Sequence, residues 1–174
     1  ETMVMRYDPA RPMHDRYSVT HDFIGPAIGD EVVSIIRTVN AFFRWELNSC
    51  ETLVRDGVVY PIDYANATPD LAMTSLHYYF PWAIRSLLKW IVFCCATGRR
   101  QTVDLDTRRY FAIADDKDLS YTQRLREYRR LADKQLEVER YQAFCAKHLA
   151  HVDEASVEWV ESLEFDHVIV VEPQ

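Results

Sequence analysis

Two carboxylates and an amide flank a turn signal in residues 49–70, SCETLVRDGVVYPIDYANATPD. Glu51 precedes the dipeptide Asp56-Gly57, and Asp63 and Asn66 follow it. Asp-Gly between two apolar runs is a strong signal for a β-hairpin. Carboxylate and amide oxygens are the hard ligands that suit Mg²⁺, which takes its remaining ligands from water and phosphates. The segment is therefore a candidate magnesium site.

The geometry of the turn decides whether the two carboxylates lie on the same face. If Asp56-Gly57 is a two-residue turn, Glu51 lies opposite Ile62, and Asp63 points away from Glu51. If residues 55–57 form a three-residue loop, Glu51 and Asp63 share a face, offset by one step. Both loop types are common, so the sequence leaves the choice open. The metal set requires the longer loop.

Asn66 joins the two carboxylates only if the second strand is irregular near its end. In a regular strand, residues 63 and 66 point to opposite faces. One extra residue near Ala65 would turn Asn66 toward Asp63. The ordinary alternative is that Glu51 and Asp63 are exposed hairpin acids, and that Asp70 caps the helix that follows.

The same residues carry a resemblance to a known family. An acid, a hairpin and a second acid closely followed by Asn occur in FFRWELNSCETLVRDGVVYPIDYANATPD, which resembles the metal-binding end of the ATP-grasp superfamily. The resemblance covers about residues 29–96. It implies that Glu51, Asp63 and Asn66 hold two Mg²⁺ ions that bridge the phosphates of ATP. The second acid is commonly Glu in that family, and the spacing from this acid to Asn is one residue longer here.

The resemblance also implies a function and a place within a longer protein. ATP-grasp enzymes phosphorylate a substrate carboxylate with ATP, and an amine or similar nucleophile then displaces the phosphate. Such an enzyme needs an N-terminal domain and a lid, so this chain looks like the C-terminal part and is expected to be inactive alone. No side-chain nucleophile is required, and the catalytic residues remain unknown. Arg6 and Arg16, in MVMRYDPARPMHDRY, are candidate partners for phosphate or carboxylate.

Two other functions are compatible with the sequence. The first is a non-catalytic ATP-grasp-like module that binds a partner or peptide. The second is a structural or interaction domain in which the hairpin has no ligand and a helical C-terminal extension makes the contacts. Magnesium-dependent ATP turnover would separate the enzyme from both.

Composition limits the remaining classes of function. The net charge of −7 argues against a nucleic-acid surface, which would need a basic face. The four cysteines form no C-x-x-C pair, so reduced thiols and a cytoplasmic location are expected. The most apolar run, residues 78–97, contains Arg85 and Lys89, which disfavours a membrane helix. A homodimer is allowed.

Apolar periodicity predicts an α+β chain, in which an antiparallel hairpin sheet packs with helices. Helical spacing covers residues 30–43, with Asp30 as the N-cap, and residues 119–150, as one helix or two. We divide the chain into residues 1–98, the C-terminal part of an ATP-grasp domain, and residues 99–174, a mainly helical extension. The other expected elements are strands over 2–7, 45–55, 58–64 and 165–171, helices over about 71–97 and 153–163, and an extended segment after Gly98.

Overall fold

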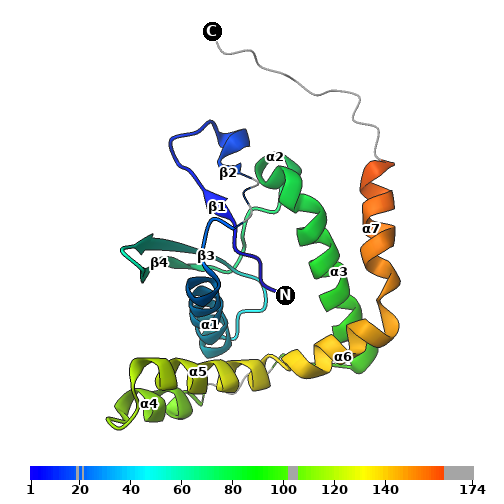
Figure 1. Cartoon of the computed structure of the whole chain (residues 1–174). Coiled ribbons are helices and arrows are strands. Elements are labelled where there is room, and N and C mark those ends of the chain that lie inside the picture. The colour runs from blue at the N-terminus through cyan, green and yellow to red at the C-terminus, as the bar shows by residue number, and fades with distance from the viewer. Residues whose placement is uncertain (19, 21, 102–105, 163–174) are drawn as a thin grey trace.

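A computed structural model describes residues 1–18, 20, 22–101 and 106–162 of the chain. The protein is α+β, as the sequence predicts: it combines helices with two small antiparallel sheets, each of two strands (Figure 1). The strand predicted over residues 165–171 lies outside the described residues.

The elements run from a short N-terminal hairpin to a series of helices (Figure 1). Before the predicted boundary at residue 98 they are β1 (Arg6–Tyr7), η1 (Met13–Asp15), β2 (Tyr17–Ser18), α1 (Pro26–Phe43), β3 (Ser49–Arg55), β4 (Val58–Asn66), α2 (Met73–Leu76), η2 (His77–Tyr79) and α3 (Phe80–Thr97). After it they are α4 (Arg108–Asp115), α5 (Tyr121–Gln135), α6 (Val138–His148) and α7 (His151–Glu161).

Helix α1 begins earlier than the apolar pattern predicts. Pro26 lies in its first turn, where a missing N–H costs nothing and the fixed φ suits the helix. Gly25 is the N-cap residue, so the prediction that Asp30 caps this helix is wrong. Arg44 ends the helix in the left-handed conformation, with φ 63°.

The end of α3 is where the sequence places it. Gly98 adopts φ 62°, and its N–H closes the last carbonyl groups of the helix. The predicted start near residue 71 is instead divided among α2, the 3₁₀ turn η2 and α3. Pro81 lies in the first turn of α3, where proline is tolerated.

The predicted helix over residues 119–150 is two helices. Ser120 and Gln123 form a capping box at the start of α5, in which each side chain accepts the other residue's backbone N–H. Glu137 separates α5 from α6 with φ 55°, a left-handed conformation that ends regular helix. Beyond the break, α6 contacts α3 (Figure 1).

The sequence did not predict helix α4. An extended segment is expected after Gly98, but the structure has a helix whose Tyr110 is buried. The ring of Phe42 from α1 packs edge-to-face on Tyr110, with ring centroids 5.3 Å apart. Tertiary packing of this kind routinely overrides local propensity.

The apolar core is shared by the two predicted parts of the chain. Ala41 of α1, Tyr110 of α4 and Ala132 of α5 form one buried cluster. Phe93 of α3, which is fully buried, packs edge-to-face on Tyr141 of α6 at 5.5 Å. The division at residue 98 stays a prediction, and the helices after it complete the core of those before it.

Arg99 forms a polar centre where three segments meet. Its side chain, 9% exposed, pairs with Glu46 after α1, and its Nε lies 3.1 Å from Glu137 Oε1 at the α5–α6 break. The guanidinium also lies 4.7 Å from the centroid of the Trp90 ring in α3. Trp90 Nε1 donates to Glu46 at 3.1 Å, which closes the network.

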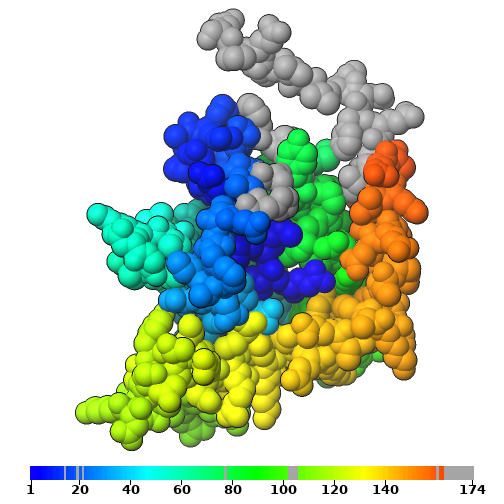
Figure 2. All heavy atoms as spheres, viewed as in Figure 1, coloured from blue at the N-terminus to red at the C-terminus, as the bar shows by residue number. Residues whose placement is uncertain are grey.

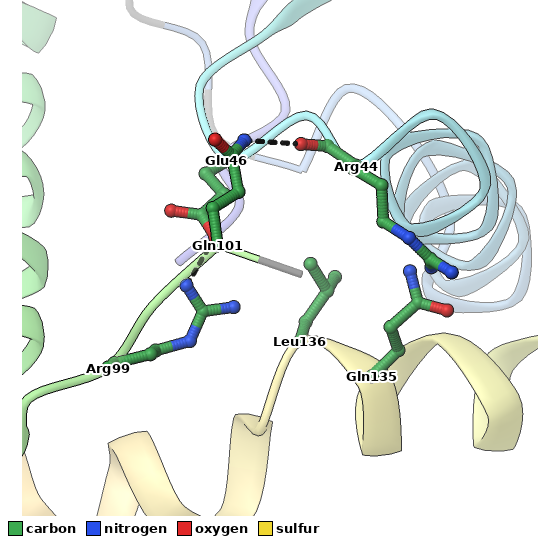
Figure 3. Close-up of a pocket in the computed structure, with 6 residues that line it drawn as sticks. All are labelled: Arg44, Glu46, Arg99, Gln101, Gln135 and Leu136. Carbon is green, nitrogen blue, oxygen red and sulfur yellow. Dashed lines mark hydrogen bonds and ion pairs between the residues drawn. The ribbon is translucent and has the colours of Figure 1, made fainter. Parts of the chain in front are cut away.

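These groups surround a small cavity of about 20 Å³ (Figure 3). Gln101 donates to the backbone oxygen of Arg44 at 3.1 Å, and Gln135 donates to that of Ala41. The side chains therefore satisfy the end of α1, and the cavity is too small for a ligand. The residues that line it are Arg44, Glu46, Arg99, Gln101, Gln135 and Leu136.

Helix α3 is the one helix of the described residues with the length and hydropathy of a candidate membrane span. Its two cations make ion pairs inside the protein. Lys89 donates to Asp153 Oδ1 of α7 at 2.7 Å, and Arg85 Nε lies 3.1 Å from the same oxygen. These pairs hold α7 along α3 (Figure 1).

We predict that Arg99→Ala lowers the free energy of unfolding by about 2–4 kcal/mol, because it leaves two acids without their partner and removes a ring contact. Urea denaturation followed by circular dichroism measures the change. Arg100→Ala is the matched control, since Arg100 is exposed, and it should change stability by less than about 0.5 kcal/mol. Equal effects of the two substitutions would contradict a central role for Arg99.

Candidate functional site

The turn of the β3–β4 hairpin contains two residues. Asp56 has φ 53° and Gly57 has φ 75°, the pair of positive angles of a type I′ turn. Arg55 accordingly lies opposite Val58. The three-residue loop that the metal set was expected to require is therefore wrong.

Glu51 and Asp63 nevertheless lie directly opposite each other. Thr52 pairs with Pro61, and the next pair is Glu51 with Asp63, so Ile62 is an extra residue in β4. A β-bulge of this kind advances one strand by one residue relative to its partner. The bulge does what the longer loop was expected to do.

A second irregularity brings in Asn66. Ser49 pairs with Asn66, so β4 uses three steps from Asp63 while β3 uses two steps from Glu51. The extra residue falls at Tyr64 or Ala65, which confirms the irregularity predicted near Ala65. Opposite residues share a face, and so do residues two apart in a strand. Glu51, Asp63 and Asn66 thus lie on one face of the hairpin, and all three are exposed.

Local hydrogen bonds orient two of these three side chains. Asp63 Oδ1 accepts the backbone N–H of Ala65 at 3.2 Å, across the second irregularity. Asn66 Nδ2 donates to Ser49 Oγ at 2.7 Å. The amide therefore uses its nitrogen within the hairpin, and its oxygen is the atom that suits a cation. This donor set has the hard-oxygen chemistry that Mg²⁺ prefers.

The opposite face of the hairpin is fixed to α1. Asn48 donates to Asn40 Oδ1 of α1 at 2.8 Å and to the backbone oxygen of Tyr64 at 3.0 Å. The hydroxyl groups of Thr52 and Tyr64 lie 2.6 Å apart. Sequence reasoning did not identify Asn48, because its partners are eight and sixteen residues away and follow no short motif.

Cys50 lies on this inner face, beside the site. Burial and, secondarily, the charge of Asp63 raise the pKa of its thiol to about 11. The thiol is therefore protonated near neutral pH and is a poor nucleophile. Its pKa also reports the charge at Asp63.

The N-terminal hairpin approaches the site through an aromatic pair. Tyr7 and Tyr17 lie opposite each other, with ring centroids 5.2 Å apart. Burial raises the pKa of Tyr17, nearby charges on Glu51 and Asp70 raise it further, and Arg16 lowers it. Tyr17 is thus close enough to Glu51 and Asp70 for their charges to act on it.

The two predicted anion-binding arginines differ in their placement. Arg16 donates to the Tyr7 hydroxyl at 3.3 Å and, through Nε, to the backbone oxygen of Arg11 at 3.1 Å. Arg6 is adjacent to Tyr7 in β1 and therefore points to the opposite face of this ribbon. Arg16 therefore bonds to the aromatic pair, whereas Arg6 lies on the other face of the ribbon.

Asp70 contributes to local structure and to the charge of the site. Its carboxylate accepts the backbone N–H of Ala72 at 2.8 Å and the hydroxyl of Ser75, just ahead of and within α2. These hydrogen bonds lower the pKa of Asp70. Within the described part of the chain, no three His, Cys, Asp or Glu side chains group closely enough to hold a metal by themselves. The proposed set has two carboxylates and an amide.

Comparison with known proteins identifies no relative of this chain. No family model, no curated protein and no solved structure matches the chain. The resemblance to the ATP-grasp superfamily therefore rests on the hairpin residues themselves, and the function drawn from it is a proposal.

We predict that Asp63→Asn lowers the pKa of Cys50 and speeds its alkylation at about pH 9 by roughly 2- to 10-fold, because the thiolate no longer faces a carboxylate. Mass spectrometry of the Cys50 peptide after timed iodoacetamide treatment measures the rate. Glu51→Gln is the matched control, since Glu51 does not affect the pKa of this thiol. An unchanged rate in Asp63→Asn would show that the two groups are not coupled.

Proposed function

We propose that the chain is the C-terminal, metal- and phosphate-binding part of an ATP- and Mg²⁺-dependent carboxylate–amine ligase. The observation that carries the proposal is the register of β3 and β4. Two irregularities align Glu51, Asp63 and Asn66 on one exposed face. An ordinary exposed hairpin needs no such alignment, whereas a cation site does.

The three side chains have distinct roles in this proposal. Glu51 and Asp63 would supply the carboxylates, and Asn66 a neutral oxygen, to hold two Mg²⁺ ions beside the phosphates of ATP. Bound magnesium neutralises the charge that develops on a phosphoryl group during transfer. The hydrogen bond from the Ala65 N–H steadies Asp63, and the donation to Ser49 steadies Asn66. Both reduce the motion that must be lost when a cation binds.

The reaction follows from the same resemblance. The γ-phosphoryl group of ATP is transferred to the substrate carboxylate, and ADP leaves. An amine then attacks the acyl carbon, inorganic phosphate leaves, and an amide bond forms. Arg16 and Arg6 are the candidate partners for phosphate or carboxylate oxygens, and the bond from Arg16 to Tyr7, the partner of Tyr17, favours Arg16.

The proposal extends to the setting of the enzyme. A longer protein would contribute the remaining ATP-binding elements, so this chain alone is expected to lack turnover. We place it in the cytoplasm, where ATP and Mg²⁺ are both present and where reduced cysteines are the norm. Its partners are ATP, a carboxylate substrate and an amine acceptor, without nucleic acid or membrane, and a homodimer is allowed.

We predict that Mn²⁺, a spectroscopic substitute for Mg²⁺, binds this chain at the hairpin and that Glu51→Gln weakens binding by at least about 10- to 100-fold. Electron paramagnetic resonance of unbound Mn²⁺ measures the affinity, and competition with Mg²⁺ shows that one site takes both ions. Asn66→Ala should weaken binding less, because it removes a neutral ligand.

The control is Glu158→Gln, which removes an exposed acid of α7 and should leave Mn²⁺ affinity unchanged. In the longer protein, Glu51→Gln and Asn66→Ala should abolish Mg²⁺-dependent ATP turnover. Turnover that survives both substitutions would remove these residues from the site.

A further inference from the structure

The β3–β4 hairpin has large apolar side chains in solvent. It projects from the body of the protein, on the left in Figures 1 and 2. Among the described residues, neither strand pairs with a third strand on its outer side. A two-stranded ribbon is marginally stable in water, and unpaired edges are places where another strand can add. The exposed apolar side chains are Leu53 (57%), Val54 (43%), Val58 (48%), Tyr60 (48%) and Ile62 (55%).

The ladder determines which backbone groups face outward at each edge. In a two-residue hairpin, the pair next to the turn exchanges both hydrogen bonds, and the pairs then alternate. Arg55 with Val58 is such a pair, and Leu53 with Tyr60 is the next. Between them, Val54 directs its N–H and C=O away from β4, and Thr52 does the same beyond Leu53.

The two edges therefore differ. On β4, the residue whose backbone faces outward opposite Thr52 is Pro61, which has no N–H. Proline at this position closes an edge against strand addition. On β3, Thr52 and Val54 both retain an outward donor and acceptor. On β4, Val59 opposite Val54 keeps its outward N–H, but Pro61 interrupts the row beside it. The β3 edge is thus the more open of the two.

We propose that β3 pairs antiparallel with β3 of a second copy of the chain, centred on Leu53. The product is a four-stranded sheet in the order β4-β3-β3-β4, with a twofold axis at the centre. Antiparallel pairing of one strand with itself is isologous, so it closes at two copies. This inference goes beyond the proposed function and does not depend on it.

Charge complementarity selects this register. The outward groups allow centres at Thr52, Leu53 or Val54. Only the Leu53 centre sets Glu51 opposite the partner's Arg55, and symmetry makes this pair twice. A centre at Thr52 sets Glu51 opposite the partner's Leu53. A centre at Val54 sets Arg55 opposite the partner's Leu53.

The same register fits the other side chains. Leu53 meets the partner's Leu53 on the outer face, so an exposed apolar group gains an apolar neighbour. Thr52 and the partner's Val54 form a β-branched pair on the inner face. Arg55 is available for pairing, because its side chain is 85% exposed and its ion pair with Asp56, at 3.6 Å, lies in solvent.

Sedimentation velocity of this chain over a wide range of concentration, in EDTA, tests the proposal. Wild type should show a reversible monomer–dimer equilibrium. Arg55→Glu sets two acids against each other twice and should raise the dimer dissociation constant about tenfold or more. Glu51→Arg should do the same, and the double variant Glu51→Arg with Arg55→Glu should restore dimerisation. Arg100→Glu, the same change of charge at an exposed site, should leave the equilibrium unchanged.

Val54→Pro tests the edge without changing charge. It removes an outward N–H that the β3–β4 ladder does not use, so the fold should persist by circular dichroism while the dimer is lost. Any of three results would overturn the proposal. The wild-type chain stays monomeric, or the dimer survives Val54→Pro, or the single charge substitutions weaken the dimer and the double variant does not restore it. Glu51 belongs to both proposals, whereas Val54 and Arg55 lie outside the metal set. The Val54 and Arg55 variants, measured in EDTA, therefore test the dimer independently of the metal site.

Discussion

The largely enclosed guanidinium of Arg99 makes the interactions on which the arrangement of the helices depends. It follows the left-handed residue that ends α3, and it joins the loop after α1 to the break between α5 and α6. A cation removed from water is costly unless each of its donors has a partner. The folded state must therefore bring all of its partners into contact with it. Glu46 positions the chain just ahead of β3, and Glu137 sets the direction of α6. The network thereby relates the hairpin to the helical part of the protein.

The chemistry of the hairpin follows from where its ladder is interrupted. The turn fixes the register near Arg55, and Ile62 then changes it before Glu51 is reached. Without that extra residue, Asp63 would lie on the face of the hairpin that packs on α1. Its charge would then need a partner on that face. The hydrogen bond from Asn48 to Asn40 fixes the inner face of the hairpin to α1. The two ladder irregularities determine which side chains lie on the outer face. Anchoring and irregularity together decide which side the acids occupy.

Sequence patterns predicted features that depend on a few adjacent residues. Asp56-Gly57 identified the turn and Gly98 the end of α3, because both positions need φ above zero. The bulge at Ile62 was not predicted, since a bulge depends on the partner strand as well as on its own. Helix α4 was missed because the burial of Tyr110 comes from Phe42, far away in the chain. For the candidate site, the sequence predicted the types of residue. It did not predict the face of the hairpin on which their side chains lie.

Pro61 has a consequence for assembly in a crowded cell. A ribbon with two open edges can take up strands at both sides, and its growth has no natural end, as in fibrils. Here Pro61 removes one outward N–H from the β4 edge, so strand addition is disfavoured on that side relative to the β3 edge. An exposed apolar hairpin can then remain in solution without becoming a seed for polymer. Pro61 on β4 thus favours a closed dimer over an open-ended polymer.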